Sequence, residues 1–146
     1  MMTSYKVMVD YSMSLEDMIA AGKYDFVNGY ITTTNFPIDR EETGKEDVEV
    51  ILVCLGESLT TEQVKSEFYR RGLKPATIME LLALGASHPE LQREFSILAL
   101  GSSLRNRGHL YFPYLYTIVD GRGLDLDWFD TGLKFGELWR YLTVRK

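Results

Sequence analysis

From residue 96 onward the chain carries no helix signal, and this constrains the fold more than any other feature of the sequence. Short apolar runs and alternating stretches follow one another there, separated by glycine and proline, which is the pattern of β-strands joined by turns. The helix signals lie earlier, in segments 14–22, 61–71 and 78–86. Helices and strands segregated in this way predict an α+β domain with mainly antiparallel strand pairing.

The expected helices begin at residues that suit N-caps. Ser14 and Thr61 stand at such positions, and Thr77 with Glu80 forms a capping box, while Gly22 is placed to end the first helix. Strands are predicted over 5–11, 48–55, 97–100, 110–119, 124–128 and 139–145, with an irregular loop over 28–47, an extended link at Pro75 and a turn at Gly121 and Gly123. Because no linker divides the 146 residues, we expect a single domain spanning 1–146.

Charge and cysteine content exclude several classes of protein. Lys and Arg number 16 against 21 Asp and Glu, a net charge of −5, whereas a duplex-binding protein carries a basic excess, so no nucleic-acid partner is expected. Cys54 is the only cysteine, which excludes an internal disulfide and a multi-cysteine zinc site. The apolar runs are far shorter than the roughly 20 residues of a membrane span, and the N-terminus lacks a signal-peptide pattern. We therefore expect a soluble protein without membrane insertion, with the monomer favoured.

The residue types that carry catalysis are scattered. His88 and His109 stand alone, and Cys54 lies in an apolar run typical of a buried strand. No segment combines a nucleophile, a base and an orienting group. We therefore expect no catalytic residues and no enzyme activity.

Four aspartates lie close together at positions 120, 125, 127 and 130. Asp125 and Asp127 share one face of an expected strand and could hold a hard cation. Their spacing matches no EF-hand calcium loop, and aspartate in an alternating strand ordinarily forms the solvated side of that strand. We expect neither a metal nor a cofactor, and keep as the alternative a small phage or bacterial metal-dependent enzyme that uses these aspartates.

The stretch HLYFPYLY, residues 109–116, has the most distinctive local composition of the chain. Successive side chains of a strand point to opposite sides, so one face of this stretch packs into the core while the other presents tyrosine or histidine. Tyrosine covers a large area and also forms hydrogen bonds, which suits binding surfaces. The stretch is consistent with core packing alone and with a core that carries a binding face.

Residues 58–87 resemble a known family. The segment LTTEQVKSEF (59–68), followed by YRRGLKPATIMEL (69–81), is similar to the helix, Pro-Thr link and glutamate-containing helix of C-type lectin-like folds of the formylglycine-generating-enzyme type. Ala76 stands between Pro75 and Thr77, a departure that leaves the helix cap intact. The closing WRYLTVR (139–145) is similar to the last strand of that fold. The resemblance implies two helices, 61–71 and 78–86, around a small twisted antiparallel sheet whose first and last strands are adjacent.

The motifs for the best-known activities of that family are missing. Cys54 is alone, so the copper-binding cysteine pair has no counterpart, and the disulfides and calcium motifs of animal lectins are absent from the sequence. The use that remains is the fold as a display scaffold, as in the variable proteins of diversity-generating retroelements of phages, bacteria and archaeal viruses. These proteins are cytoplasmic or virion-associated. The resemblance implies a display protein that binds a protein or surface glycan through a variable region within 103–135.

Two further expectations concern that region. Adenine-directed mutagenesis of Asn-type codons cannot produce Trp, Lys, Glu, Gln or Met, which implies scaffold roles for Trp128, Lys134, Glu137 and Trp139. Strand alternation predicts an inward set of Leu110, Phe112, Leu124, Leu126 and Trp128. The outward, ligand-binding set is Ser103, Arg105, Asn106, His109, Tyr111, Ile118, Asp125, Asp127, Phe129 and Leu133. We expect these residues to lie on the sheet face opposite the two helices.

Overall fold

The computed structural model describes residues 2–38, 44–119, 121–128, 134–136 and 138–145. In chain order its elements are β1 (Met2–Asp10), α1 (Leu15–Gly22), β2 (Phe26–Val27), β3 (Lys45–Cys54), β4 (Leu59–Thr60), α2 (Thr61–Arg70), β5 (Leu73–Pro75), α3 (Ile78–Ser87), α4 (Leu91–Glu94), β6 (Ile97–Leu98), β7 (Leu104–Asn106), β8 (His109–Ile118), β9 (Gly121–Trp128), β10 (Lys134–Phe135) and β11 (Arg140–Arg145).

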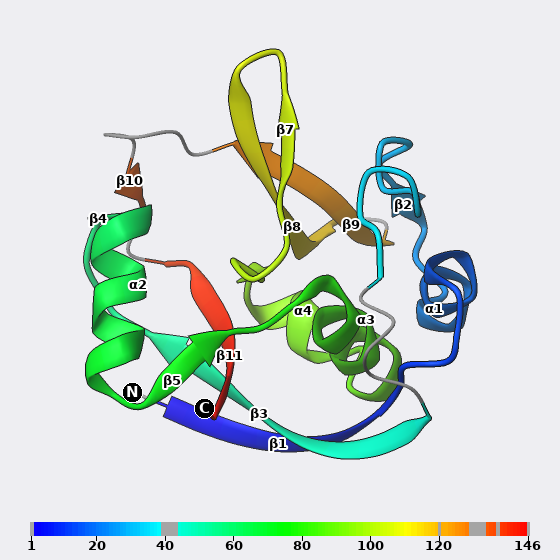
Figure 1. Ribbon diagram of the computed structural model, residues 1–146, viewed down its shortest axis with the longest axis horizontal. Coiled ribbons are helices and arrows are strands. Elements are labelled where there is room, and N and C mark those ends of the chain that lie inside the picture. The colour runs from blue at the N-terminus through cyan, green and yellow to red at the C-terminus, as the bar shows by residue number, and fades with distance from the viewer. Residues whose placement is uncertain (1, 39–43, 120, 129–133, 137, 146) are drawn as a thin grey trace.

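The strands form a 9-stranded open sheet with the order β1-β3-β11-β6-β8-β9-β2, in which β5 also pairs with β11 and β7 with β8 (Figure 1). Strands β4 and β10 form a separate pair. Among the pairings described, β6 with β11 and β2 with β9 are parallel and the others are antiparallel. The predicted α+β class with mainly antiparallel pairing is confirmed. The sheet is larger than the small one that the lectin resemblance implies.

Helices cover both faces of this sheet. In β3, Val50 belongs to a core that also contains Leu81 of α3 and Leu15 of α1. The next residue, Ile51, belongs to a second core that contains Phe68 of α2. Because neighbouring strand residues point to opposite sides, α1 and α3 pack on one face and α2 packs on the other. The expectation that region 103–135 lies opposite both helices 61–71 and 78–86 is therefore wrong, since these helices do not share a face.

Local capping fixes where the helices begin. The Ser14 hydroxyl accepts a hydrogen bond from the Asp17 amide at the start of α1, and the predicted capping box of Thr77 and Glu80 opens α3. The N-cap of α2 is Thr60 rather than Thr61, because Thr60 exchanges hydrogen bonds with Gln63 in a capping box of its own. Both threonines fit the sequence signal, and only the backbone turn decides between them.

The expected adjacency of the first and last strands is not found. Strand β1 pairs with β3, and β3 pairs with β11, so one strand lies between the two ends of the chain. The segment that fills this place is the β-branched run of β3, which pairs along its whole length with β1. This order departs from the arrangement that the lectin resemblance implies.

Short elements also escaped the sequence analysis. Strand β2, strand β7 and the single turn of α4 lie in segments for which no element was predicted, and the loop predicted over 28–47 already contains the start of β3. Gly123, expected in a turn, lies within β9 opposite Tyr116. Within the described ranges no helix is long and apolar enough to cross a membrane.

Candidate functional site

The register of the β8–β9 hairpin decides which side chains share a surface. Tyr111 lies opposite Trp128, and Tyr114 lies opposite Asp125. Directly paired residues of antiparallel strands point to the same side of the sheet. Odd-numbered residues of β8 therefore share a face with even-numbered residues of β9, and the remaining residues of both strands share the other face.

This register corrects both sets expected from alternation. Tyr111 and Asp125 were placed on one outward face, but they lie on opposite faces of the hairpin. Phe112 and Leu124 were both placed inward, and both are buried, but in the two different cores. The alternation within β9 was right, but in β8 the outward set joined Ile118 to Tyr111, although Ile118 lies on the same face as Phe112. The faces of β8 and β9 were also joined out of phase, because each strand buries side chains on both sides.

One of these faces brings four polar and aromatic side chains together: Tyr114, Tyr116, Asp125 and Asp127. We name this group the aromatic–acidic face. The ring centroids of Tyr114 and Tyr116 lie 5.5 Å apart, and the Trp139 ring meets that of Tyr114 edge-on at 5.2 Å. The face lies on the same side of the sheet as α2, since Phe112, its neighbour on β8, is in the α2 core.

Each carboxylate of this face has one oxygen held in place. Asp125 Oδ1 accepts hydrogen bonds from Asn28 Nδ2 at 2.8 Å and from the Leu126 amide at 2.7 Å. Asp127 Oδ1 accepts one from the Trp128 amide at 2.9 Å. In the part of the chain that the structure describes, the second oxygen of each carboxylate has no partner and is not buried. Neither carboxylate forms an ion pair there.

The pKa values of the side chains of this face are shifted by burial and by the charges of its own carboxylates. Burial, followed by the charges of Asp125 and Asp127, raises the pKa of Tyr114 to about 12. Burial and Asp125 also raise the pKa of Tyr116. Burial and the Asp125 charge raise the pKa of Asp127, against the opposing effect of the Trp128 amide. The face thus concentrates negative charge beside neutral phenol rings.

A hollow of about 480 Å³ opens at one side of this face. Its walls combine the segment around β2 with the hairpin, and they consist of Phe26, Val27, Asn28, Gly29, Tyr30, Tyr116 and Asp125. Asn28 connects the two walls through its bond to Asp125, and its own Oδ1 accepts a hydrogen bond from the Tyr30 amide. Phe26 and Tyr30 are exposed aromatic residues. The volume lies in the range of small-molecule and side-chain pockets.

A buried polar network holds the backbone beneath the face. Gln92 Nε2 donates to the carbonyls of Tyr116 at 2.8 Å and of Gly123 at 3.0 Å, while its Oε1 accepts from Arg122 Nη2 at 2.8 Å. Arg122 also donates to the carbonyls of Gly22 and Gly85, near the C-terminal ends of α1 and α3. A cation is favourable at a helix C-terminus, so the network connects the hairpin to both helices.

Gly123 makes room for one ring of the face. A Cβ atom at this position would lie 2.2 Å from Cε1 of Tyr116. The Tyr116 ring therefore lies directly over the glycine backbone, which only a residue without a side chain permits. The sequence analysis missed Tyr116, Tyr114 and Asn28, although the alternation of tyrosine in residues 109–116 is the signal that could have found the two tyrosines.

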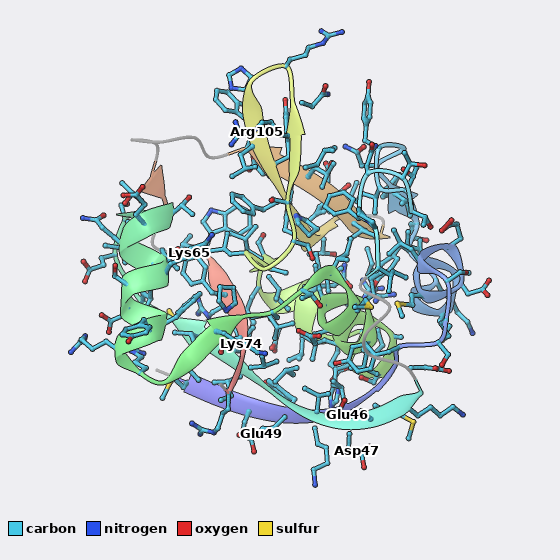
Figure 2. The ribbon with its side chains drawn as sticks, viewed as in Figure 1. Glu46, Asp47, Glu49, Lys65, Lys74 and Arg105 are labelled. Carbon is cyan, nitrogen blue, oxygen red and sulfur yellow. The ribbon has the colours of Figure 1, made fainter. Side chains whose placement is uncertain are left out.

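The structure separates the remaining predicted ligand-binding residues. Arg105 and Ser103 are exposed in and beside the β7–β8 hairpin, whose turn at Arg107 and Gly108 has two positive φ angles (Figure 2). Asn106 and Tyr111 are half-buried, and Ile118 is exposed at the opposite end of β8. Phe129 and Leu133 lie outside the described residues.

Trp128 is not an inward residue. Its side chain is 40% exposed, and His109 stacks against its ring with 4.2 Å between centroids. Together with Tyr111 these rings lie on the hairpin face opposite the aromatic–acidic face. The strand runs beyond the core at this point, so alternation no longer implies burial.

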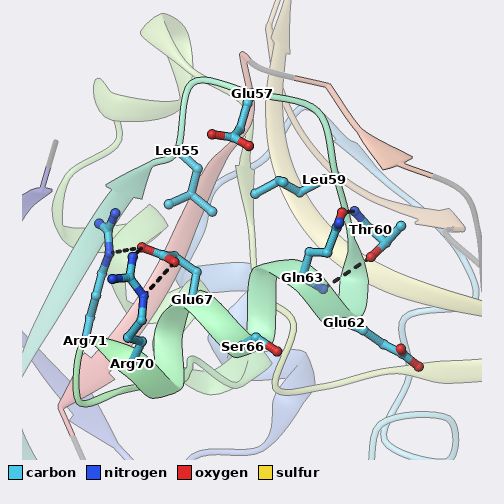
Figure 3. A pocket seen from close by; sticks show the side chains of 10 residues that line it. All are labelled: Leu55, Glu57, Leu59, Thr60, Glu62, Gln63, Ser66, Glu67, Arg70 and Arg71. Carbon is cyan, nitrogen blue, oxygen red and sulfur yellow. Dashed lines mark hydrogen bonds and ion pairs between the residues drawn. The ribbon is translucent and has the colours of Figure 1, made fainter.

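A larger hollow of about 880 Å³ lies beside α2 (Figure 3). Glu67 forms ion pairs with Arg70 at 2.6 Å and with Arg71 at 2.8 Å, whereas Glu57 and Glu62, which also line the hollow, form no ion pair in the described residues. These arginines lower the pKa of Glu67 through hydrogen bonds and charge. No aromatic residue lines the α2 hollow, so it does not combine carboxylates with aromatic rings as the aromatic–acidic face does.

Comparisons with family models, with curated proteins and with solved structures returned no match to this chain. In the described residues, no three His, Cys, Asp or Glu side chains are grouped so as to hold a metal ion. The candidate site therefore stands on its own geometry.

Proposed function

We propose that this chain is a ligand-binding protein that recognises a cationic group of its ligand at the aromatic–acidic face. The observation that carries the proposal is the pair of carboxylates, Asp125 and Asp127, each with one free oxygen beside the rings of Tyr114 and Tyr116. An alkylammonium or guanidinium group interacts favourably with both kinds of neighbour.

The physical chemistry supports a cation over an anion or a purely apolar group. A cation above a tyrosine ring is stabilised by about 0.5–1 kcal/mol at an exposed site, and by more when it is desolvated. Two carboxylates without ion-pair partners attract any cation by charge, and add a charge-assisted hydrogen bond each to a cation that carries N–H groups. An anion would meet the same carboxylates as like charges, and the Asp125 charge already adds, after burial, to the raised pKa of Asp127.

The adjoining hollow suits a ligand larger than the cationic group alone. Exposed Phe26 and Tyr30 border it, and aromatic residues of this kind dominate the energy of protein interfaces. A lysine or arginine side chain presented by a partner protein satisfies both the charged face and this aromatic border. We therefore favour a protein ligand over a glycan.

The test uses tetramethylammonium chloride as the probe, with sodium chloride at equal ionic strength as its control. Backbone amide shifts of β8 and β9 in two-dimensional NMR report binding at the face. We expect small saturable shifts with tetramethylammonium only. Asp125→Asn removes one charge with little change in shape and should weaken probe binding by about fivefold, equivalent to ~1 kcal/mol. Asp47→Asn, an exposed aspartate on β3 away from the site (Figure 2), is the matched control.

Other outcomes would contradict the proposal. Equal shifts with both salts, or no loss in Asp125→Asn, would show that the face does not select cations. Shifts with neutral mono- and disaccharides but not with tetramethylammonium would favour a glycan ligand. A large rise in the thermal midpoint with calcium, magnesium or manganese that Asp125→Asn abolishes would favour the metal-dependent enzyme.

The finer proposal is that this face is the variable surface of a diversity-generating retroelement protein, displayed in the cytoplasm or on a virion. Its support is the residue composition. The face consists of Tyr and Asp, both of which adenine-directed mutagenesis of Asn-type codons can produce, and it lies within 103–135. The order of β1, β3 and β11 argues against the lectin-like fold on which this idea rests. A reverse-transcriptase gene beside this gene, with a near-copy of its 3′ end that differs at adenines, would support the finer proposal, and a neighbourhood without them would overturn it.

A further inference from the structure

The outer edge of β1 is an open hydrogen-bonding edge of the sheet. Strand β1 is the first in the strand order and pairs on one side with β3 (Figure 1). The Tyr11 amide donates to the Gly44 carbonyl at 2.8 Å, which continues the β1–β3 register by one pair. Hydrogen-bonded pairs alternate along antiparallel strands, so the odd residues of β1 bond to β3 and the even residues direct their N–H and C=O groups outward.

The hydrogen bonds on the other side of β3, toward β11, also imply that the even residues of β1 direct their backbone groups outward. The Arg140 amide donates to the Ser96 carbonyl, and the Ala76 amide donates to the Leu142 carbonyl. The backbone N–H and C=O groups of the even residues of β11 therefore point away from β3. Tyr141 and its partner Val53 therefore form a hydrogen-bonded pair, and the even residues of β3 bond to β1. Val50, an even residue of β3, is paired with Tyr5, an odd residue of β1, so the odd residues of β1 bond to β3 and its even residues point outward.

This edge lacks most of the devices by which proteins protect exposed strands. Such edges are usually short, carry charged side chains such as lysine, or are interrupted by proline, bulges or inward charges, and of these devices β1 has one, the charge of Lys6. Strand β1 spans 9 residues, pairs with β3 without a bulge and contains no proline. Among the described residues its end alone is closed, where the Asp10 carbonyl accepts from the Met13 amide. The outward backbone groups of Ser4, Lys6 and Met8 have no hydrogen-bond partner within the described ranges.

We propose that a second copy of this chain pairs with this edge, β1 antiparallel to β1, about a two-fold axis at Tyr5. In this register Met2 lies opposite the partner's Met8, and Ser4 lies opposite the partner's Lys6. Met2 and Met8 are 49% and 57% exposed, and the pairing covers both. The two Tyr5 side chains meet at the axis as a non-hydrogen-bonded pair, the type with the closest side chains.

Like charge disfavours one neighbouring register, and an occupied carbonyl disfavours another. An axis at Lys6 would place two lysines directly opposite each other, which is unfavourable. An axis at Val7 would leave Met2 unpaired and would use the Asp10 carbonyl that Met13 already occupies. With the axis at Tyr5, Lys6 keeps its cross-strand neighbour Glu49 and meets no like charge directly.

Composition alone favoured a monomer, and sedimentation velocity over a range of protein concentrations decides between the two states. We expect a reversible monomer–dimer equilibrium for the unmodified chain. Lys6→Pro removes one outward N–H without removing a bond to β3, since proline is tolerated on an edge strand whose N–H faces solvent. It should abolish the dimer. Lys6→Thr also loses the lysine side chain but keeps the N–H, and should still dimerise.

A second pair of variants tests the register. Ser4→Glu places a carboxylate opposite the partner's Lys6 and should tighten the dimer, whereas Ser4→Lys places a like charge there and should weaken it. An axis at Val7 would reverse this order, because Ser4 would then face the partner's Asp10. A wild-type monomer at all concentrations, a dimer that persists in Lys6→Pro, or the reversed order for the Ser4 variants would each overturn the proposal. Circular dichroism of every variant confirms that it is folded.

Discussion

Tyr111 and Asp125 lie on opposite faces of the β8–β9 hairpin, although each strand by itself places them on its polar side. Tyr111 faces Trp128 across the ladder, and Asp125 faces Tyr114. The hairpin therefore carries two separate surfaces, the aromatic–acidic face and a cluster of His109, Tyr111 and Trp128. Substitutions in one surface should therefore leave the other unaffected.

The first prediction compares Phe112 and Trp128, two large aromatic residues that strand alternation places in the same inward set. Phe112→Ala should lower the free energy of unfolding by about 3–5 kcal/mol, because the side chain is 1% exposed and its removal leaves a cavity in the α2 core. Trp128→Ala should cost only about 1 kcal/mol, mainly the stacking with His109. Urea denaturation measures both values. Equal costs would show that Trp128 is as buried as Phe112, which would contradict its 40% exposure.

The second prediction concerns the buried guanidinium of Arg122. Arg122→Met should destabilise the fold by about 2–4 kcal/mol, because it leaves the buried carbonyls of Gly22 and Gly85 and the Gln92 amide without their donor. Arg122→Lys should restore only part of this, since one ammonium group cannot reach acceptors arranged for a planar fork. Denaturant midpoints give the comparison, and a Lys variant as stable as the wild type would contradict it.

The third prediction separates the two threonines at the start of α2. Thr60→Ala should cost about 1 kcal/mol, because the Thr60 hydroxyl accepts the Gln63 amide bond that caps the helix. Thr61→Val should be neutral or stabilising, because the Thr61 hydroxyl is buried without a hydrogen-bond partner in the described residues. Thermal melts of the two variants test this order. The reverse order would move the helix boundary by one residue.

The fourth prediction is a loss of stability at alkaline pH. Burial raises the pKa of Tyr24 to about 12, against a lesser opposing effect of Arg122. An unfolded tyrosine titrates near 10.0, so between about pH 10 and 12 the folded state keeps a proton that the unfolded state has lost. Stability is therefore full below pH 10 and falls as pH rises through this window.

Tyr24→Phe provides the control for this effect. The variant keeps the ring and removes a hydroxyl that has no hydrogen-bond partner in the described residues. Its thermal midpoint should equal or exceed that of the wild type near neutral pH and should decline less steeply between pH 10 and 12. An identical decline in both proteins would assign the alkaline loss to other groups, such as Tyr114.

The fifth prediction links Gly123 to the candidate site. Gly123→Ala should displace the Tyr116 ring, because the new Cβ would lie 2.2 Å from it. We expect a loss of about 1–3 kcal/mol of stability from overpacking, together with weaker tetramethylammonium binding. Gly123→Ala combined with Tyr116→Ala should recover part of the stability but not the binding. Unchanged probe affinity in the single variant would remove Tyr116 from the binding face.

The sequence by itself determined the class of the fold and the places of its longer elements. Ser14 and the Thr77–Glu80 box begin helices where local signals predict them, because a cap depends only on residues within one turn. The β-branched run of β3 and the alternation of β9 likewise predict strands from local pattern. The exclusion of a disulfide follows from the single Cys54 alone.

Only the tertiary structure decided which faces meet. The phase between β8 and β9 places Tyr114 with Asp125 rather than Tyr111 with Asp125, and no single strand contains that information because a shift of one residue exchanges the faces. The insertion of β3 between β1 and β11 is a long-range pairing, and it leaves β1 with an open edge. In the sequence, the flanking Gly121 and Gly123 predict that Arg122 is an ordinary polar residue of a turn. It is buried because the ends of α1 and α3 converge on it with unpaired carbonyls, a charge distribution that exists only once the chain has folded.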